Sequence, residues 1–320
     1  MNRNPSFLNN RVVTGAIIAL ALFLIIIPAY TWPLWTLIFL TLIALAMSLE
    51  LHNALSRIFR PLSVMLALAS TATLLAPAVA WLTYGDGYKG WQFIPLSMLP
   101  PNAISATWQL DYLRLVGSGA LCYLILFMLL LIASCTYTVL RYGPERLPQT
   151  AAATSAGLYI AFPFMCLHLM LFAVPNGYRW LFPAVFLPLV ADTAAYYGGR
   201  FLGKHPFFPK LSPKKTREGA VIGILAGVLA ALLYFVIFLS GPQEPFHPTG
   251  GALAFGIVGG LLISLAGEAG DLYASALKRW VGIKDFGHSL PGHGGFLDRF
   301  DSVLFSAPMT FFVMLAYYHF

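Results

Sequence analysis

The chain has 320 residues, of which 59% are hydrophobic and only 10% are charged. An ordinary soluble domain carries about 25% charged residues, so this composition excludes a soluble fold and predicts that lipid surrounds most of the chain. The formal net charge of +7 is also found in nucleic-acid binders. We favour the other explanation, that basic residues gather on the cytoplasmic side of a membrane protein, and we expect no nucleic-acid partner.

Nine apolar segments are long enough to cross a bilayer, which takes about 20 mostly apolar residues. In chain order they cover residues 12–30, 33–51, 61–84, 115–140, 151–173, 180–198, 219–240, 250–280 and 301–319. The first segment is longer than a signal-peptide core and no small-residue cleavage site follows it, so we expect it to remain as a transmembrane helix. The sequence therefore predicts an all-α, polytopic integral membrane protein with about nine transmembrane helices.

The lysines and arginines indicate how the chain is oriented. With the N-terminus in the cytoplasm, nine spans place 16 of the 19 basic residues in inside segments and leave Lys89, Arg114 and Arg179 outside. Cytoplasmic segments carry the excess of basic residues, so we expect an N-in, C-out chain. In a bacterium it would lie in the inner or plasma membrane.

Acidic residues in or beside the predicted spans are concentrated towards the C-terminus. A charge at the centre of a spanning helix costs about 2.5–3.5 kcal/mol on insertion scales, so each such residue calls for an explanation. They are Glu50, Asp192, Glu268, Asp271, Asp298 and Asp301, and five of these six lie in the last 130 residues. We therefore predict that residues 1–175 are a scaffold of transmembrane helices and that residues 176–320 form the catalytic region.

The segment before the seventh span is basic and leads directly into a helix. Ser212, Lys214, Lys215, Thr216 and Arg217 precede that span, and the N-terminus of a helix favours anions. Taken alone, the lysines are explained as well by contact with anionic lipid headgroups. Phosphate binding needs a further reason.

The eighth span carries the densest set of polar residues, in GEAGDLYASALKRW. Helical periodicity places Asp271, Ser275, Lys278 and Arg279 close to one face, with Glu268 one turn earlier. An acid, a hydroxyl and two cations on one stripe suit a site that binds a metal together with phosphate. Lys278 and Arg279 alone would be explained by snorkelling at a helix end, whereas Asp271 lies deeper in the span and favours a function.

A glycine-rich segment, VGIKDFGHSLPGHGGFLDRFDS, follows this span. Glycines such as Gly294 and Gly295 allow the backbone to approach a ligand closely, and Lys284 can pair with a phosphate. We interpret His288 and His293 as supports of the loop.

Three charged residues, Asp298, Arg299 and Asp301, then stand at the mouth of the ninth span. For Asp301, which Ser302 follows, a helix cap and a catalytic role are equally consistent with the sequence.

Two blocks of the sequence resemble the signature of the phosphatidate cytidylyltransferases, or CDP-diacylglycerol synthases. SALKRWVGIKDFGHSLPGHGGFLDRFD, from Ser275 to Asp301, contains S-x-x-K-R, K-D, P-G-H-G-G and D-R-x-D in register. ADTAAYYGGRFLGKHPFFPKLSPKKTREG, from Ala191 to Gly219, contains D-x-x-A-Y, G-R and S-P-K-K-T-x-E-G. One departure is Ala274, where many family members carry an acid, while this chain has Glu268 instead.

The resemblance implies that a phosphate oxygen of phosphatidate attacks the α-phosphorus of CTP, giving CDP-diacylglycerol and pyrophosphate. Such chemistry depends on positioning and charge neutralisation, and it implies Mg²⁺, as one ion or two. The expected metal ligands are Asp271 and Asp298, with Asp192 and Asp301 as further candidates. The expected catalytic residues are Asp271, Asp298, Lys278, Arg279 and Lys284. The expected phosphate-binding residues are Ser212, Lys214, Lys215, Thr216, Ser275, Gly294, Gly295 and Arg299. In the orientation above, all of them lie on the cytoplasmic face.

Two alternatives remain at this stage. A CTP-dependent lipid kinase of the polyprenol or phytol type has a broadly similar architecture but transfers the γ-phosphate, and the run from P-G-H-G-G to D-R-x-D argues against it. An ion-coupled transporter would distribute polar residues through both leaflets and show repeated halves, which this sequence does not. The expected partners are CTP, phosphatidate and membrane lipids. The sequence leaves open whether the chain forms a homo-oligomer.

Overall fold

A computed structural model describes residues 17, 20–30, 33–59, 106–173, 177–209, 211–239, 250–290 and 294–319. Most of these residues are helical. The helices are the 3-10 turn η1 (Ile27–Tyr30), α2 (Pro33–Leu55), α4 (Ala106–Tyr142), the 3-10 turn η4 (Pro144–Arg146), α5 (Leu147–Ala173), α6 (Tyr178–Leu202), α7 (Arg217–Phe238), α8 (Gly250–Val281), α9 (Leu297–Phe300) and α10 (Val303–His319). Two short strands, β1 (Pro206–Phe208) and β2 (Ser212–Thr216), form a hairpin.

The prediction of a helical, polytopic membrane protein is confirmed. In the described part of the chain six helices are long and apolar enough to cross a membrane: Trp35–Leu55, Leu124–Tyr142, Pro144–Leu171, Tyr178–Leu202, Arg217–Phe238 and Leu253–Val281. The predicted spans 12–30 and 301–319 correspond to shorter apolar helices, Leu20–Ala29 and Val303–Tyr318. The predicted span 61–84 lies outside the described residues, so the number of nine spans stays a prediction.

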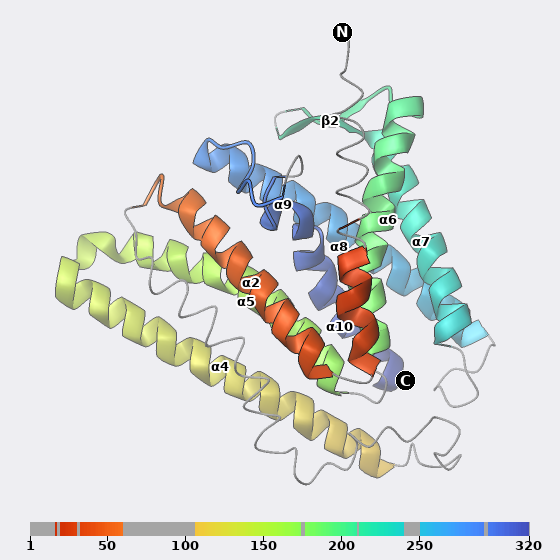
Figure 1. Ribbon diagram of the computed structural model, residues 1–320, viewed down its shortest axis with the longest axis horizontal. Helices are drawn as coiled ribbons and strands as arrows, with labels where there is room; N and C mark the ends of the chain where they lie inside the picture. The colour runs from red at the N-terminus through yellow and green to blue at the C-terminus, as the bar shows by residue number, and fades with distance from the viewer. Residues whose placement is uncertain are drawn as a thin grey trace.

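Helices α6, α7 and α8 pack against one another, and α10 packs against α5, α6 and α8 (Figure 1). Gly219, Gly223 and Gly227 follow each other at intervals of four residues along α7, a spacing that lets transmembrane helices approach closely. A Cβ on Gly223 would lie 2.8 Å from both the Ala191 carbonyl oxygen and the Ala195 Cβ of α6. The small residues of α7 therefore allow the close contact that positions α7 beside α6.

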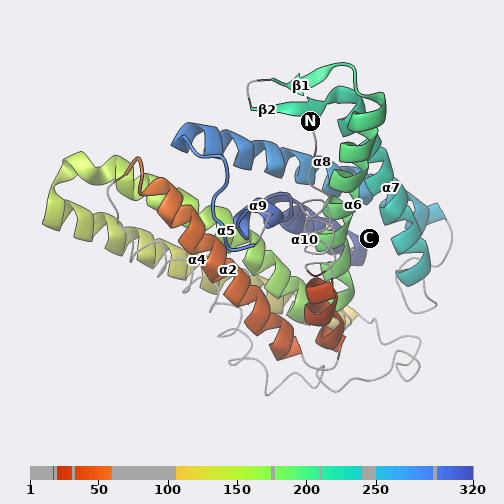
Figure 2. The same cartoon turned by 45° about the horizontal axis from the view of Figure 1, so that its top comes forward.

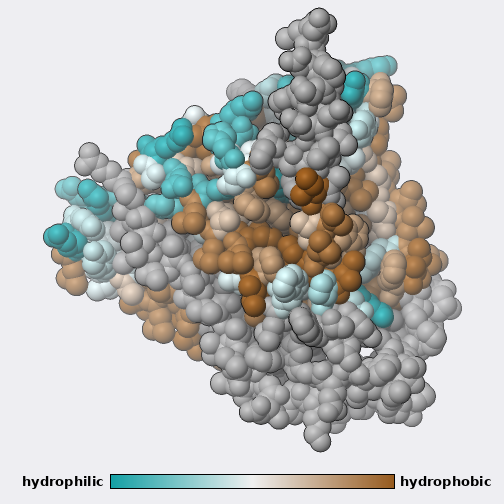
Figure 3. Space-filling view, in the orientation of Figure 1, coloured by the Kyte–Doolittle hydropathy of each residue, from teal (hydrophilic) through white to brown (hydrophobic). Residues whose placement is uncertain are grey.

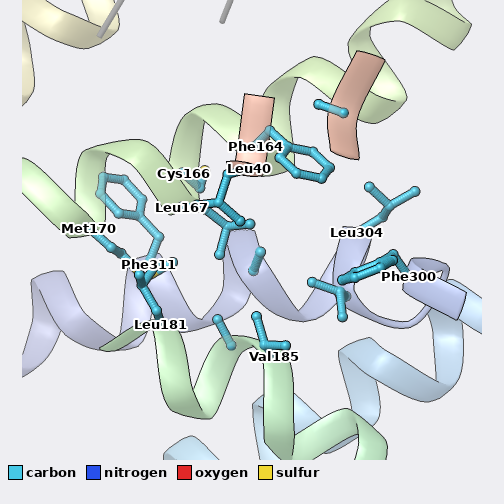
Figure 4. Close-up of a cluster of buried hydrophobic side chains, with 14 of the residues drawn as sticks. Leu40, Phe164, Cys166, Leu167, Met170, Leu181, Val185, Phe300, Leu304 and Phe311 are labelled. Carbon is cyan, nitrogen blue, oxygen red and sulfur yellow. The ribbon is translucent and has the colours of Figure 1, made fainter. Parts of the chain in front are cut away.

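The apolar core joins both ends of the sequence. Helices α2 and α4 pack against α5, which in turn packs against α6 and α10. Figure 4 shows Leu40 of α2 and Phe164 of α5 in one buried cluster with Val185 of α6 and Leu304 of α10. The predicted scaffold, residues 1–175, and the predicted catalytic region, residues 176–320, therefore share a core.

Hydrophilic side chains gather along one edge of the molecule, above a broad hydrophobic surface (Figure 3). The hairpin and the C-terminal end of α8 lie along this edge (Figure 1). The sequence predicted only a basic segment between α6 and α7, whereas the structure pairs Pro206 with Thr216 and Phe208 with Ser212 in antiparallel register. Glu218, on the first turn of α7, accepts hydrogen bonds from the backbone N–H groups of Lys204 and His205 at 3.1 and 3.2 Å. This contact ties the hairpin to α7.

Candidate active site

The predicted site residues come mainly from the hairpin, the C-terminal half of α8 and α9, whose courses can be followed in Figure 2. Side chains of a strand point alternately to its two faces, and β2 places Lys214 outward, where it is exposed. Lys215 points the other way. Its Nζ lies 2.7 Å from Glu268 Oε1 and 2.5 Å from Asp271 Oδ2. One lysine of the predicted pair is therefore a partner of the acids on α8.

The two carboxylates keep Lys215 charged. Burial by itself lowers the pKa of the Lys215 ammonium, but the negative charges of Asp271 and Glu268 outweigh burial and hold that pKa above its ordinary value. Thr216 follows as the N-cap of α7, where its hydroxyl accepts a hydrogen bond from the Gly219 N–H at 3.2 Å. The cap places Lys215 at the foot of α7, facing α8.

Asp192 and Asp301 lie close enough to Asp271 to interact with it electrostatically. The hydroxyl of Ser302 donates to Asp192 Oδ2 at 2.9 Å, and the Ser302 N–H donates to Asp301 Oδ1 at 2.9 Å. The second contact is with the next residue only, whereas a capping side chain accepts from an N–H two or three residues on, so both predicted roles of Asp301 stay predictions. Lys215 pairs with Glu268 and Asp271, and Lys278 pairs with Asp298, so acidic groups outnumber these two lysines around Asp271.

Asp298 makes a different set of contacts, with Lys278 and with the described flanks of the glycine-rich segment, residues 286–290 and 294–297, called here the loop flanks. Lys278 Nζ donates to Asp298 Oδ1 at 2.9 Å. The N–H groups of Phe286 and Gly295 donate to Asp298 Oδ2 at 2.8 and 3.0 Å. Asp298 is thus buried among donors. Its Oδ2 fixes the loop flanks through two N–H groups, and its Oδ1 faces the Lys278 side chain.

Glu50 of α2 reaches the same loop flanks, although it comes from the predicted scaffold. Its carboxylate accepts hydrogen bonds from the Ser289 hydroxyl at 2.7 Å, the Phe296 N–H at 3.0 Å and the Leu297 N–H at 2.9 Å. The sequence marked Glu50 as a costly acid near the end of a span but gave it no partner. Glu50 therefore links α2, in the predicted scaffold, to a segment of the predicted catalytic region.

The other predicted residues surround these contacts. Ser275 Oγ lies 3.4 Å from Asp271 Oδ1. Arg279 Nε donates to the Leu211 carbonyl oxygen at 3.3 Å, which ties α8 to the hairpin. Among the predicted site residues, the exposed cations are Lys214, Arg279, Lys284 and Arg299.

Two of the predicted phosphate contacts are constrained by the fold. Gly294 adopts a φ of 80°, which favours glycine, and its carbonyl oxygen accepts from the Leu290 N–H at 2.9 Å. The Gly295 N–H already donates to Asp298. Ser212 begins β2 and is half-buried, while His293 lies outside the described residues.

Carboxylates are the ligands that Mg²⁺ prefers, usually one or two of them together with phosphate oxygens and waters. No group of three or more His, Cys, Asp or Glu in the described ranges is arranged to hold a metal ion by itself. Asp271, with the carboxyl groups of Asp192 and Asp301 nearby, therefore fits Mg²⁺ as a partial set of ligands. Phosphate oxygens of a substrate would complete it.

A model of the cytidylyltransferase family matches residues 9–317. The chain belongs to this family. It is 37% identical over 193 residues to the phosphatidate cytidylyltransferase of Bacillus subtilis strain 168, a match that covers 59% of this chain and 66% of that protein. The protein of the same name from Staphylococcus aureus strain COL is 35% identical over 176 residues, or 54% of this chain and 62% of the relative. The one from Staphylococcus saprophyticus is 32% identical over 216 residues, or 68% of this chain and 74% of the relative.

The chain thus spans a little under two thirds of the first two of these relatives. The resemblance found in the two sequence blocks is confirmed at the level of the family. Within this member of the family, the blocks supply Asp192 and Asp301, which lie near Asp271, and Lys215, which pairs with it. Glu50 lies outside both blocks, which is why the motifs did not point to it.

Proposed function

We propose that the chain transfers the cytidylyl group of CTP to phosphatidate, giving CDP-diacylglycerol and pyrophosphate. The observation that carries the proposal is the pairing of Lys215 with Asp271 and Glu268 at the polar edge of a transmembrane bundle. It places a cation of the S-P-K-K-T block against two acids of α8. Arg279 of the other block donates to the Leu211 carbonyl oxygen, so the two blocks meet at this site. The names of the relatives support the choice of substrates.

The described cations can bind the phosphates of the two substrates. Lys215 and Lys278 now neutralise carboxylates, and their flexible side chains would turn to phosphate oxygens when a nucleotide enters. Lys214, Arg279, Lys284 and Arg299 lie exposed around this point and add positive charge for the triphosphate and the leaving pyrophosphate. Fixed charges that face the developing charge lower the barrier to phosphoryl transfer.

Mg²⁺ belongs to the proposal as the cofactor. Asp271 would be its main ligand, with Asp298 offering Oδ1 and with Asp192 and Asp301 as additional carboxylates. When bound, one or two such ions neutralise phosphate charge and orient the triphosphate. Asp298 can serve only if Lys278 leaves its Oδ1, because its Oδ2 already accepts two N–H groups.

The position of the site suits a substrate that has a phosphate headgroup and acyl chains in the bilayer. Tyr273 and Trp280 of α8 are 48% and 55% exposed, and aromatic side chains of this kind favour the boundary between membrane and water. A lipid phosphate can reach this boundary from the bilayer. The basic residues counted in the sequence place the same edge on the cytoplasmic face, where CTP is found, and this orientation is part of the proposal.

The proposal can be tested with purified full-length protein in mixed micelles. Phosphatidate, CTP and MgCl₂ should yield CDP-diacylglycerol by mass spectrometry and an equal amount of pyrophosphate. Omitting either substrate should abolish both products. A protein that binds CTP and phosphatidate but forms neither product would contradict the proposed function.

A further inference from the structure

We propose that Glu50 is a positioning residue that holds the loop flanks in the shape that binds the phosphates of CTP. The identity of this ligand rests on the proposed function. The described hydrogen bonds of Glu50 go to Ser289, Phe296 and Leu297, and none of these three is a predicted metal ligand or phosphate-binding residue. It acts from α2, a helix outside the sequence blocks that carry the family signature.

The contacts of Glu50 match what a carboxylate can do. Its Oε1 accepts from the Ser289 hydroxyl and the Phe296 N–H, and its Oε2 accepts from the Leu297 N–H. All three partners are donors, and an ionised carboxylate is an acceptor only. Glu50 is only 7% exposed. A buried charge is costly without hydrogen bonds, so Glu50 and the loop flanks stabilise each other.

Glu50 also explains why two residues of the loop flanks are glycines. Neither Gly287 nor Gly295 has a positive φ, so the backbone conformation does not require glycine at either position. A Cβ on Gly287 would lie 2.5 Å from Glu50 Oε1 and 2.7 Å from its Cδ. A Cβ on Gly295 would lie 2.5 Å from the same Cδ. At both positions the three nearest atoms belong to Glu50, so glycine is needed to admit this side chain.

The loop flanks connect Glu50 to the predicted active site. Three consecutive N–H groups are held by carboxylates: that of Gly295 by Asp298, and those of Phe296 and Leu297 by Glu50. Asp298 is in turn held by Lys278. Without Glu50 the flanks would adopt the binding shape only part of the time. The apparent affinity for a ligand is reduced in proportion to the fraction of protein in the binding-competent state. Removing Glu50 should therefore weaken the binding of CTP.

The first test compares three variants of the full-length protein. Glu50→Ala should raise the dissociation constant and the apparent KM for CTP at least about tenfold, because about 1.4 kcal/mol of lost preorganisation corresponds to one decade. The kcat at saturating CTP should stay within about threefold of wild type, because bound ligand selects the competent loop. For Glu50→Gln, the dissociation constant and the apparent KM for CTP should lie between those of wild type and Glu50→Ala. The amide oxygen can keep two of the hydrogen bonds, while the NH₂ group faces the Leu297 N–H. Glu145→Gln, at an exposed glutamate of η4, should leave all three values unchanged.

A fall in kcat or in melting temperature without a change in KM would show that Glu50 is merely structural. Unchanged CTP binding in Glu50→Ala would also overturn the proposal.

The second test measures the contact itself and needs no turnover. Gly287→Ala should lower the melting temperature in the wild-type background, and the loss should be at least halved in a Glu50→Ala background, where the added methyl group meets no carboxylate. Such coupling is the signature of two residues in contact. If Gly287→Ala lowers the melting temperature equally in both backgrounds, Glu50 does not contact the loop flanks in the way proposed. Absence of CDP-diacylglycerol with wild-type protein would instead refute the proposed function, so the two failures are distinguishable.

Discussion

Replacing Lys215 by methionine should destabilise the protein in the absence of Mg²⁺, because Asp271 and Glu268 would lose their shared counter-charge. Methionine keeps most of the length of the side chain and removes only the ammonium. Removing one partner of a fully buried ion pair costs about 3–5 kcal/mol. The three side chains are 14% to 23% exposed, so water screens the charges in part and we expect a loss of about 1–3 kcal/mol.

The measurement is thermal unfolding in detergent, first with EDTA and then with increasing MgCl₂. A loss of this size should lower the melting temperature by roughly 2–12 °C, at about 2–4 °C per kcal/mol for a large domain. Mg²⁺ should raise the melting temperature of Lys215→Met more than that of wild type, because the ion no longer competes with the ammonium for Asp271 and ligand binding stabilises the folded state.

The matched control is Lys214→Met, which makes the same charge change one residue earlier, on the exposed face of β2. It should melt like wild type and respond to Mg²⁺ like wild type. If both variants melt alike, or if Mg²⁺ shifts all three proteins equally, Lys215 does not neutralise these acids and they do not form the proposed metal site.

Three further predictions concern the two expected metal ligands and the topology. Asp271→Asn should lower kcat at least about a hundredfold, at about 1.4 kcal/mol per decade, with normal elution in size exclusion; near-normal activity at low Mg²⁺ would exclude it as a ligand. Asp298→Asn should lose activity and also have a lower melting temperature. If the asparagine oxygen still accepts from the two N–H groups, its NH₂ group faces Lys278 and the ion pair is lost. An unchanged melting temperature would contradict the anchoring role of Asp298. A reporter that is active only outside the cytoplasm should give a signal when fused after Phe320 and none when fused after Lys204, and the reverse pattern would refute the orientation.

The contacts within one helix were predictable from the sequence. Asp271, Ser275 and Lys278 share a face of α8 because the helix runs without a break from Gly250 to Val281, and helical periodicity is the strongest pattern in a sequence. The apolar spans were predictable for a similar reason, since their length is set by the thickness of the bilayer.

The contacts between distant segments were not predictable from periodicity. Lys215 meets Glu268 across 53 residues, and Ser289 meets Glu50 across 239. The first contact depends on a short hairpin that orients Lys214 and Lys215 to opposite sides, and the second on the packing of α2. The only signal for Glu50 in the sequence was the cost of an acid beside a span, which marks a residue as important without naming its partner.

The central claim, transfer of a cytidylyl group, is tested most directly by following two labels on one nucleotide. CTP labelled at both the α- and the γ-phosphorus would be incubated with phosphatidate, Mg²⁺ and purified protein. We expect the α label to enter the lipid fraction and the γ label to leave as pyrophosphate, with Asp271→Asn blocking both. Appearance of the γ label in the lipid together with CDP would identify a lipid kinase and contradict the proposed function.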